Sequence, residues 1–147
     1  MPEDVQGRAQ KLLEDQSVLE SNMEAVQQRL ELLRAVLSNY RSGLAVLEEM
    51  EKKQGGEEML ISIGGNAYIQ AQLANPGEVT RDIGSSIRIS QGLQDAKRDL
   101  GEDIASLEQQ YAQLAKDYQN IVLQAASVNA QLQELAQKQA QEEPKGV

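Results

Sequence analysis

Apolar residues recur at heptad spacing through the first third of the chain, over residues 3–54. Two interleaved series, separated by alternating steps of four and three residues, carry apolar side chains at twelve of their fourteen positions. The first series is Val5, Leu12, Leu19, Val26, Leu33, Tyr40 and Leu47, and the second is Ala9, Gln16, Met23, Leu30, Leu37, Leu44 and Glu51. This spacing is typical of a coiled-coil seam, the stripe along which one helix packs against another. It predicts one long helix over residues 3–54.

The last third, residues 92–141, carries a second seam of the same length, again with twelve apolar residues at fourteen positions. Its series are Leu93, Leu100, Leu107, Leu114, Ile121, Val128 and Leu135, and Lys97, Ile104, Tyr111, Tyr118, Ala125, Leu132 and Gln139. Two helices of equal length, joined by a short segment, can lie antiparallel and bury each other's stripe. Proline, the strongest helix breaker, occurs at positions 2, 76 and 144, all outside the two predicted helices.

Between the helices, residues 55–91 read as two β-hairpins. The segment Ser62 to Gln70 is echoed by Asp82 to Ser90, and in both copies a Gly, Ser or Asn turn separates two short strands. Asn75-Pro76-Gly77 separates the hairpins. Four such strands cannot close a barrel on their own, so their apolar faces and edges need partners. The candidate oligomerisation residues are Ile61, Ile63, Ile69, Ile83, Ile87 and Ile89.

The composition excludes most enzyme chemistry. The chain contains no His and no Cys, which removes the usual nucleophile–base pairs and imidazole or thiolate metal sites. The Gly55-Gly56 and Gly64-Gly65 pairs lack the following Lys of a phosphate-binding loop, so they are interpreted as turns. Carboxylates such as Asp99 and Glu102 lie on the solvated faces of the helices. We therefore expect no enzyme activity, no catalytic or metal site and no cofactor.

Charge argues against two classes of partner. The chain has 14 Lys and Arg against 23 Asp and Glu, a formal net charge of −9 without any marked basic cluster. Phosphate backbones and anionic lipid surfaces would be repelled, so nucleic acid and membrane are not expected partners. The chain also lacks a bilayer-length apolar run and a secretory signal at its start. These features together favour a cytoplasmic protein.

The two seams weaken toward the chain termini. Ala9, Gln16, Ala125 and Gln139 occupy positions that favour large aliphatic side chains. Apolar residues off the seam gather at the same levels: Leu13, Val18, Val122, Leu123, Ala126 and Ala136. A poorly filled seam frays more easily and exposes apolar surface, which suits loose binding of hydrophobic segments. The alternative interpretation is that helix ends simply tolerate poor residues.

The hairpin segment carries the most specific resemblance. The patterns Ile-Ser-Ile-Gly-Gly-x-x-Tyr-Ile at 61–69 and Val-x-x-x-Ile-Gly-x-x-Ile-x-Ile at 79–89 lie between two long helices. This arrangement resembles the alpha-class subunits of prefoldin, also called GimC, and most closely the archaeal ones. The resemblance covers nearly the whole chain. The double hairpin is what separates the alpha class from the beta class, which has one.

The resemblance implies an assembly and a function. Two alpha-like and four beta-like subunits would combine their hairpins into a β-barrel platform with six coiled coils projecting from it. Such a complex is an ATP-independent chaperone, a holdase, that captures unfolded polypeptides at the coiled-coil tips and delivers them to a group II chaperonin. The tip residues that would bind clients here are Val5, Leu12, Leu13, Val128, Leu132 and Leu135.

The expected organisation is thus one α+β prefoldin-like domain over residues 1–147, an antiparallel two-helix coiled coil with two β-hairpins between the helices. Residues 3–54 form the first helix, 55–91 the hairpins, 92–141 the second helix and 142–147 a tail. Two alternative functions stay open. One is a structural coiled-coil tether or scaffold that oligomerises through its β region, and the other is an accessory arm of an enzyme.

Overall fold

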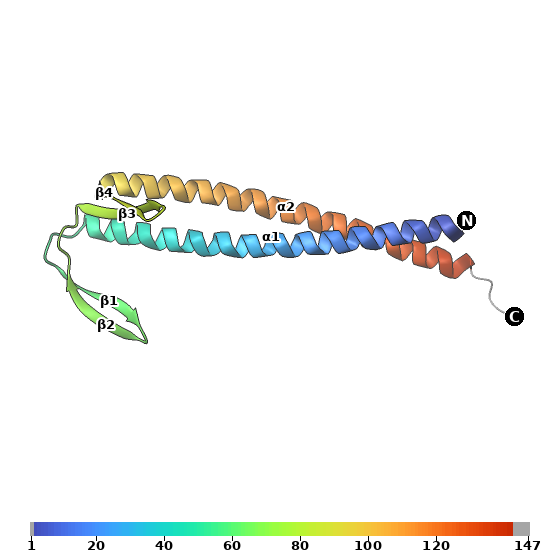
Figure 1. Ribbon diagram of the computed structural model, residues 1–147, viewed down its shortest axis with the longest axis horizontal. Coiled ribbons are helices and arrows are strands. Elements are labelled where there is room, and N and C mark those ends of the chain that lie inside the picture. The colour runs from blue at the N-terminus through green and yellow to red at the C-terminus, as the bar shows by residue number, and fades with distance from the viewer. Residues whose placement is uncertain (1, 143–147) are drawn as a thin grey trace. The chain divides into compact units, whose positions relative to one another are not determined.

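A computed structural model describes residues 2–142, and the last five residues of the predicted tail, 143–147, lie outside the described part. Helix α1 (Pro2–Glu51) is followed by strands β1 (Glu58–Gly64), β2 (Ala67–Gln72), β3 (Glu78–Gly84) and β4 (Ile87–Gly92) and by helix α2 (Leu93–Glu142) (Figure 1). The predicted fold class, two long antiparallel helices with two hairpins between them, is confirmed. Helix α1 ends at Glu51, where the amides of Lys52 and Lys53 bond to carbonyls three residues back and tighten the last turn.

The chain forms two compact units, which are described one at a time. The terminal unit consists of Met1–Arg34 and Gln109–Val147, and the central unit consists of Ala35–Glu108. The terminal unit is helical throughout its described part. The central unit holds both hairpins, the end of α1 and the start of α2.

The seam of the terminal unit packs the first part of α1 against the last part of α2. Its seam residues from position 5 to position 33, and their counterparts from 111 to 135, are buried or half-buried, while most other positions are exposed. Polar bonds cross the seam from Gln16 Nε2 to Asn129 Oδ1 (2.5 Å), from Gln27 Nε2 to Tyr118 Oη (2.8 Å) and from Arg34 Nη2 to Tyr111 Oη (2.8 Å). Each bond pairs an early residue with a late one, so together they fix the antiparallel register.

The Arg34–Tyr111 pair also stacks, with the guanidinium carbon 5.9 Å from the ring centroid, within the range of a cation–π contact. The hydrogen bond from Arg34 to the Tyr111 hydroxyl raises the pKa of the guanidinium above its ordinary value. Tyr111 and Tyr118 thus fill the seam with their rings and use their hydroxyls to join the helices.

A small apolar core anchors the central unit. Leu47 of α1 and Leu93 and Ala96 of α2 are buried against one another, with Met50, Val79 and Leu100 packed around them. At the end of α1, Glu51 accepts hydrogen bonds from Lys97 Nζ (2.7 Å) and from the Gln94 amide, so the polar residues at the end of the first seam and the start of the second are matched across the helices. The Lys97 bond, and after it the Gln94 bond, holds the pKa of the Glu51 carboxyl below its ordinary value.

The two hairpins are separate two-stranded antiparallel sheets with the same internal design. In the first, Ile61 pairs with Ile69 and Ser62 with Tyr68, and the register then shifts by one residue at Gly64. In the second, Arg81 pairs with Ile89 and Asp82 with Arg88, and the register shifts at Gly84. The internal echo in the sequence therefore corresponds to a repeated strand, bulge and turn.

Both tight turns have positive φ at their two central residues, as type I′ hairpin turns require. The first uses Gly65 and Asn66 (φ 59° and 57°), which adopt this conformation readily, but the second uses Ser85 and Ser86 (φ 52° and 62°). Serine has no such preference, because its Cβ crowds the backbone there. The second hairpin therefore stores strain that the first does not.

Replacing Ser85 with Asn and Ser86 with Gly is expected to stabilise the protein by about 1 kcal/mol, because the turn conformation then costs less. The midpoint of thermal unfolding, followed by circular dichroism, should rise by about 3 °C. The reciprocal change, Gly65→Ser with Asn66→Ser, provides the control and should lower the midpoint. Equal midpoints for the unmodified protein and the two variants would show that the two turns do not differ in strain.

Candidate functional site

Five of the six predicted tip residues belong to the seam of the terminal unit rather than to its surface. Leu12 is only 7% exposed, and Val5, Val128, Leu132 and Leu135 are half-buried. Leu13, the one predicted residue off the seam, is 55% exposed. In the folded helix pair, the seam residues already contact the opposite helix, and Leu13 alone of the six is freely accessible.

The accessible aliphatic side chains of the terminal unit flank its seam. Val18 is 58% and Leu123 68% exposed, and Val122 is also exposed. The sequence pattern indicated these residues as apolar positions off the seam. Leu32, also exposed, was missed, although it follows Val18 by two heptads and therefore lies on the same face of α1. These residues give the terminal unit apolar surface that its own packing leaves open.

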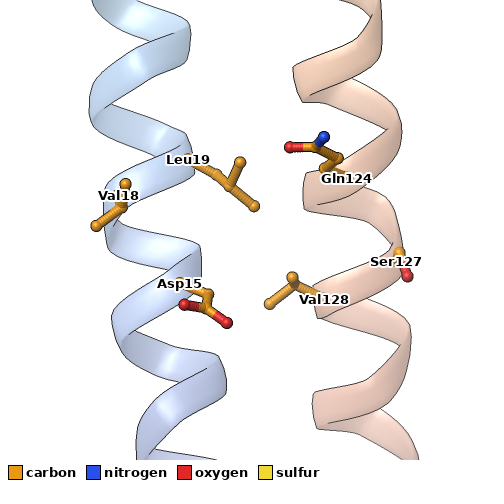
Figure 2. A pocket seen from close by; sticks show the side chains of 6 residues that line it. All are labelled: Asp15, Val18, Leu19, Gln124, Ser127 and Val128. Carbon is orange, nitrogen blue, oxygen red and sulfur yellow. The ribbon is translucent and has the colours of Figure 1, made fainter.

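A groove of about 430 Å³ opens between the helices of the terminal unit. Its lining residues are Asp15, Val18, Leu19, Gln124, Ser127 and Val128. Figure 2 shows Asp15 and Leu19 of α1 and Gln124 and Val128 of α2 projecting into the space between the helices. The groove coincides with the weak stretch of the seam, where Gln16 and Ala125 replace large aliphatic residues, so the helices leave a hollow instead of closing over it.

The oligomerisation residues predicted on the hairpins are accessible in the central unit. Ile61, Ile63, Ile69, Ile83 and Ile87 are exposed, and Ile89 is half-buried. Ile61 lies opposite Ile69 and Met59 opposite Ala71, so one face of the β1–β2 hairpin is apolar. Ser62, Tyr68 and Gln70 lie on the other face, together with the exposed Leu60. Met59 and Ala71 on this face are half-buried, whereas Ile61 and Ile69 are exposed, as expected of an assembly surface.

The β3–β4 hairpin is tied to α2 by polar contacts and by packing. Arg81, on β3, bonds to Asp103 Oδ2 through Nη2 (3.0 Å) and lies 3.8 Å from Asp99 Oδ2 through Nη1. Gln91, on β4, donates to the same Asp99 carboxylate (2.8 Å), and Val79 packs into the apolar core. Among the described residues, no ion pair joins the β1–β2 hairpin to a helix. The second hairpin is therefore positioned by its own chain.

Replacing Arg81 with Met should loosen the β3–β4 hairpin while leaving β1–β2 unaffected. The half-buried guanidinium contributes on the order of 1 kcal/mol through its two carboxylate contacts. Amide hydrogen exchange in β3 and β4 should therefore accelerate about fivefold, with the amides of β1 and β2 as the internal reference. Unchanged exchange in β3 and β4 would mean that Val79 and Gln91 hold the hairpin without the ion pairs.

Acidic side chains around Arg81 border a polar hollow of about 530 Å³, lined by Tyr40, Arg81, Asp82, Ile83, Gly84, Asp99, Glu102 and Asp103. Among residues 2–142, no group of three or more carboxylates is arranged to hold a metal ion. In the same part of the chain, neither helix is long and apolar enough to cross a membrane. The features that stand out are thus the apolar surface of the terminal unit and the apolar faces of the hairpins.

Comparisons with known proteins agree with this architecture. The family model described as "Prefoldin subunit" matches residues 19–138. The chain is 25% identical over 131 residues to prefoldin subunit alpha of Methanobrevibacter smithii, covering 89% of each protein. It is 27% identical over 125 residues to prefoldin subunit alpha of Archaeoglobus fulgidus, covering 85% of this chain and 89% of the relative.

A solved structure shows the same fold. A chain in the cryo-EM structure of filamentous PFD from Methanocaldococcus jannaschii superposes with a TM-score of 0.66 at 17% identity, and the match covers 80% of this chain and 97% of that one. The helices and hairpins of the structure, the family model and the relatives thus all indicate the same family. The chain belongs to the prefoldin family of non-enzymatic chaperone subunits, and the two relatives named above are archaeal subunits of the alpha class.

Proposed function

We propose that this chain is the alpha-type subunit of an ATP-independent holdase, in which the terminal unit captures unfolded polypeptide and the hairpins build the assembly. The observation that supports this most directly is the apolar surface of the terminal unit. Leu13, Val18 and Leu123 are all more than half exposed. Aliphatic side chains of this size are normally buried, and exposed groups of them mark binding surfaces.

Capture by such a surface is loose and broad. Each exposed aliphatic residue contributes a contact of modest strength, and these residues lie on an open surface that admits segments of different sequence. Several arms of one complex would engage the same unfolded chain, so the effective concentration at each arm is high after the first contact. The client site in this proposal comprises the groove and the exposed residues beside it. Val5, Leu12, Leu132 and Leu135 contribute where the seam opens.

Assembly is assigned to the hairpins. The apolar face of Ile61 and Ile69 is open, and strand edges without partners favour pairing with other chains. A complex of two alpha-type and four beta-type subunits around a β-barrel platform fits this surface and the membership of the family. The complex would act in the cytoplasm and pass its client to a group II chaperonin by competition for the same apolar segments, without nucleotide hydrolysis.

The test is aggregation of a denatured protein measured by light scattering, with and without the chain assembled with beta-class subunits. The proposal predicts suppression in the absence of ATP, and no further gain when ATP is added. The alternative of a structural tether predicts that scattering rises as fast as in the buffer control. Scattering unchanged by an assembled complex would therefore overturn the proposal.

A further inference from the structure

The groove of the terminal unit contains polar groups whose bonding capacity is unused. Within the described part of the chain, the Asp15 carboxylate has no ion-pair or hydrogen-bond partner, and the Gln124 side-chain amide has none either. Lys11, one helical turn before Asp15, is not in ion-pair contact with it. By contrast, Gln16 and Asn129, at the same level, bond to each other. Asp15 and Gln124 are thus free to contact an incoming molecule.

The apolar part of the groove is suited to an aliphatic side chain. Leu19 and Val128 face the space between the helices from opposite sides (Figure 2), and Val18 also lines the groove. The volume of about 430 Å³ falls in the range of small-ligand sites and exceeds what one aliphatic side chain occupies. Space therefore remains for a second, neighbouring side chain of the same ligand.

The charge of the groove identifies that second side chain. Asp15 is the single charged residue that lines it, so the groove is acidic beside an apolar floor. A lysine or arginine can lay its aliphatic stem on Val18 and Leu19 while its cationic head reaches the carboxylate. A glutamate or aspartate in the same place would lose water and meet a like charge, which is unfavourable.

We propose that this groove binds client segments in which an aliphatic residue adjoins a lysine or arginine, so that the arm selects basic–apolar segments over acidic–apolar ones. The inference rests on the proposed holdase function and deepens it by giving the capture site a chemical preference. It also places the contact at residues 15–19 and 124–128, where the seam residues Leu19 and Val128 meet the exposed Val18 and Gln124.

Fluorescence anisotropy on the complex assembled with beta-class subunits tests the proposal. The probes are three short labelled peptides with identical leucine content, in which the residues beside each leucine are lysine, serine or glutamate. The lysine peptide should bind about threefold more tightly than the serine peptide at low salt, as expected for one exposed ion pair, and the glutamate peptide more weakly. High salt should reduce the difference between the lysine and serine peptides.

Two variants separate the local contact from the acidic charge of the whole protein. Asp15→Asn should bring the lysine-to-serine affinity ratio close to one. Glu14→Gln removes the same charge one residue away and outside the groove, and it should leave the ratio near its original value. Equal ratios in the two variants, whether both reduced or both intact, would overturn the proposal. So would an unmodified complex that suppresses aggregation but binds all three peptides equally, whereas failure to suppress aggregation would overturn the proposed function itself.

Discussion

Replacing Ile61 with Asp will prevent this chain from joining beta-class subunits while leaving its helices folded. Ile61 lies on the apolar face of the β1–β2 hairpin, opposite Ile69, and is exposed in the isolated chain. A carboxylate there would be buried without a partner once another subunit covers this face, at a cost of several kcal/mol. The apparent affinity for beta-class subunits should fall by about a hundredfold or more, so the variant should no longer copurify with a tagged beta-class subunit.

Ser62→Asp is the matched control, because it adds the same charge to the neighbouring position on the opposite face of the same strand. That variant should still copurify, and both variants should retain the helical circular dichroism of the parent. An Ile61→Asp chain that assembles normally would show that the complex forms through another surface. Loss of assembly in both variants would point to the strand itself rather than to its apolar face.

Replacing Val18 and Leu123 with Ser will weaken client capture without weakening the fold. Both side chains are more than half exposed, so their removal creates little or no cavity and changes the free energy of unfolding by no more than about 0.5 kcal/mol. Each loses apolar contact area with a bound client, and together the losses should lower the apparent affinity for a denatured protein about tenfold. The readout is the concentration of complex that halves the light scattering of an aggregating client.

Val46→Ser provides the comparison for this double variant. Val46 lies on α1, as Val18 does, and is 54% exposed, but it belongs to the central unit instead of the terminal unit. Loss of an exposed valine there should leave client capture unchanged. If Val46→Ser lost as much activity as the double variant, capture would depend on exposed apolar area anywhere on the helices.

The seam and the hairpins could be predicted from the sequence because their patterns are dictated by local geometry. A residue that repeats every seven positions must return to the same side of a helix, so Leu12, Leu37 and Ile104 had to face the opposite helix. In the same way, Gly65 and Asn66 between alternating strands indicate a tight hairpin turn. The heptad spacing and the turn residues therefore predict their structures whatever the details of side-chain packing.

The predicted tip site was harder to define because apolar character alone does not distinguish packing from binding. Leu12 and Leu13 are identical in the sequence, yet one is buried in the seam and the other is exposed. Only the phase of the heptad separates them. Of the five predicted tip residues on the seam, Val128 lines the groove, whereas the other four pack within the helix pair. Their contact with a client stays a prediction that requires the helices to open.

Contacts between residues far apart in the chain could not be predicted from the sequence pattern. Nothing in the sequence around Arg81 shows that its partners are Asp99 and Asp103, since a strand arginine and a helix carboxylate meet only when the hairpin folds back onto α2. The same holds for the groove, which exists because Asp15 and Gln124 come to the same level of an antiparallel pair. That level is set by the register of the whole seam and not by any local motif.

The most direct test of the account is where a client touches the chain. A photoreactive amino acid can be placed at position 18 in one preparation and at position 46 in another, each assembled with beta-class subunits and irradiated with a radiolabelled denatured protein. If the terminal unit captures the client, a crosslinked product forms from position 18 and little or none from position 46. Crosslinks of equal yield from both positions, or from position 46 alone, would contradict the assignment of client capture to the terminal unit.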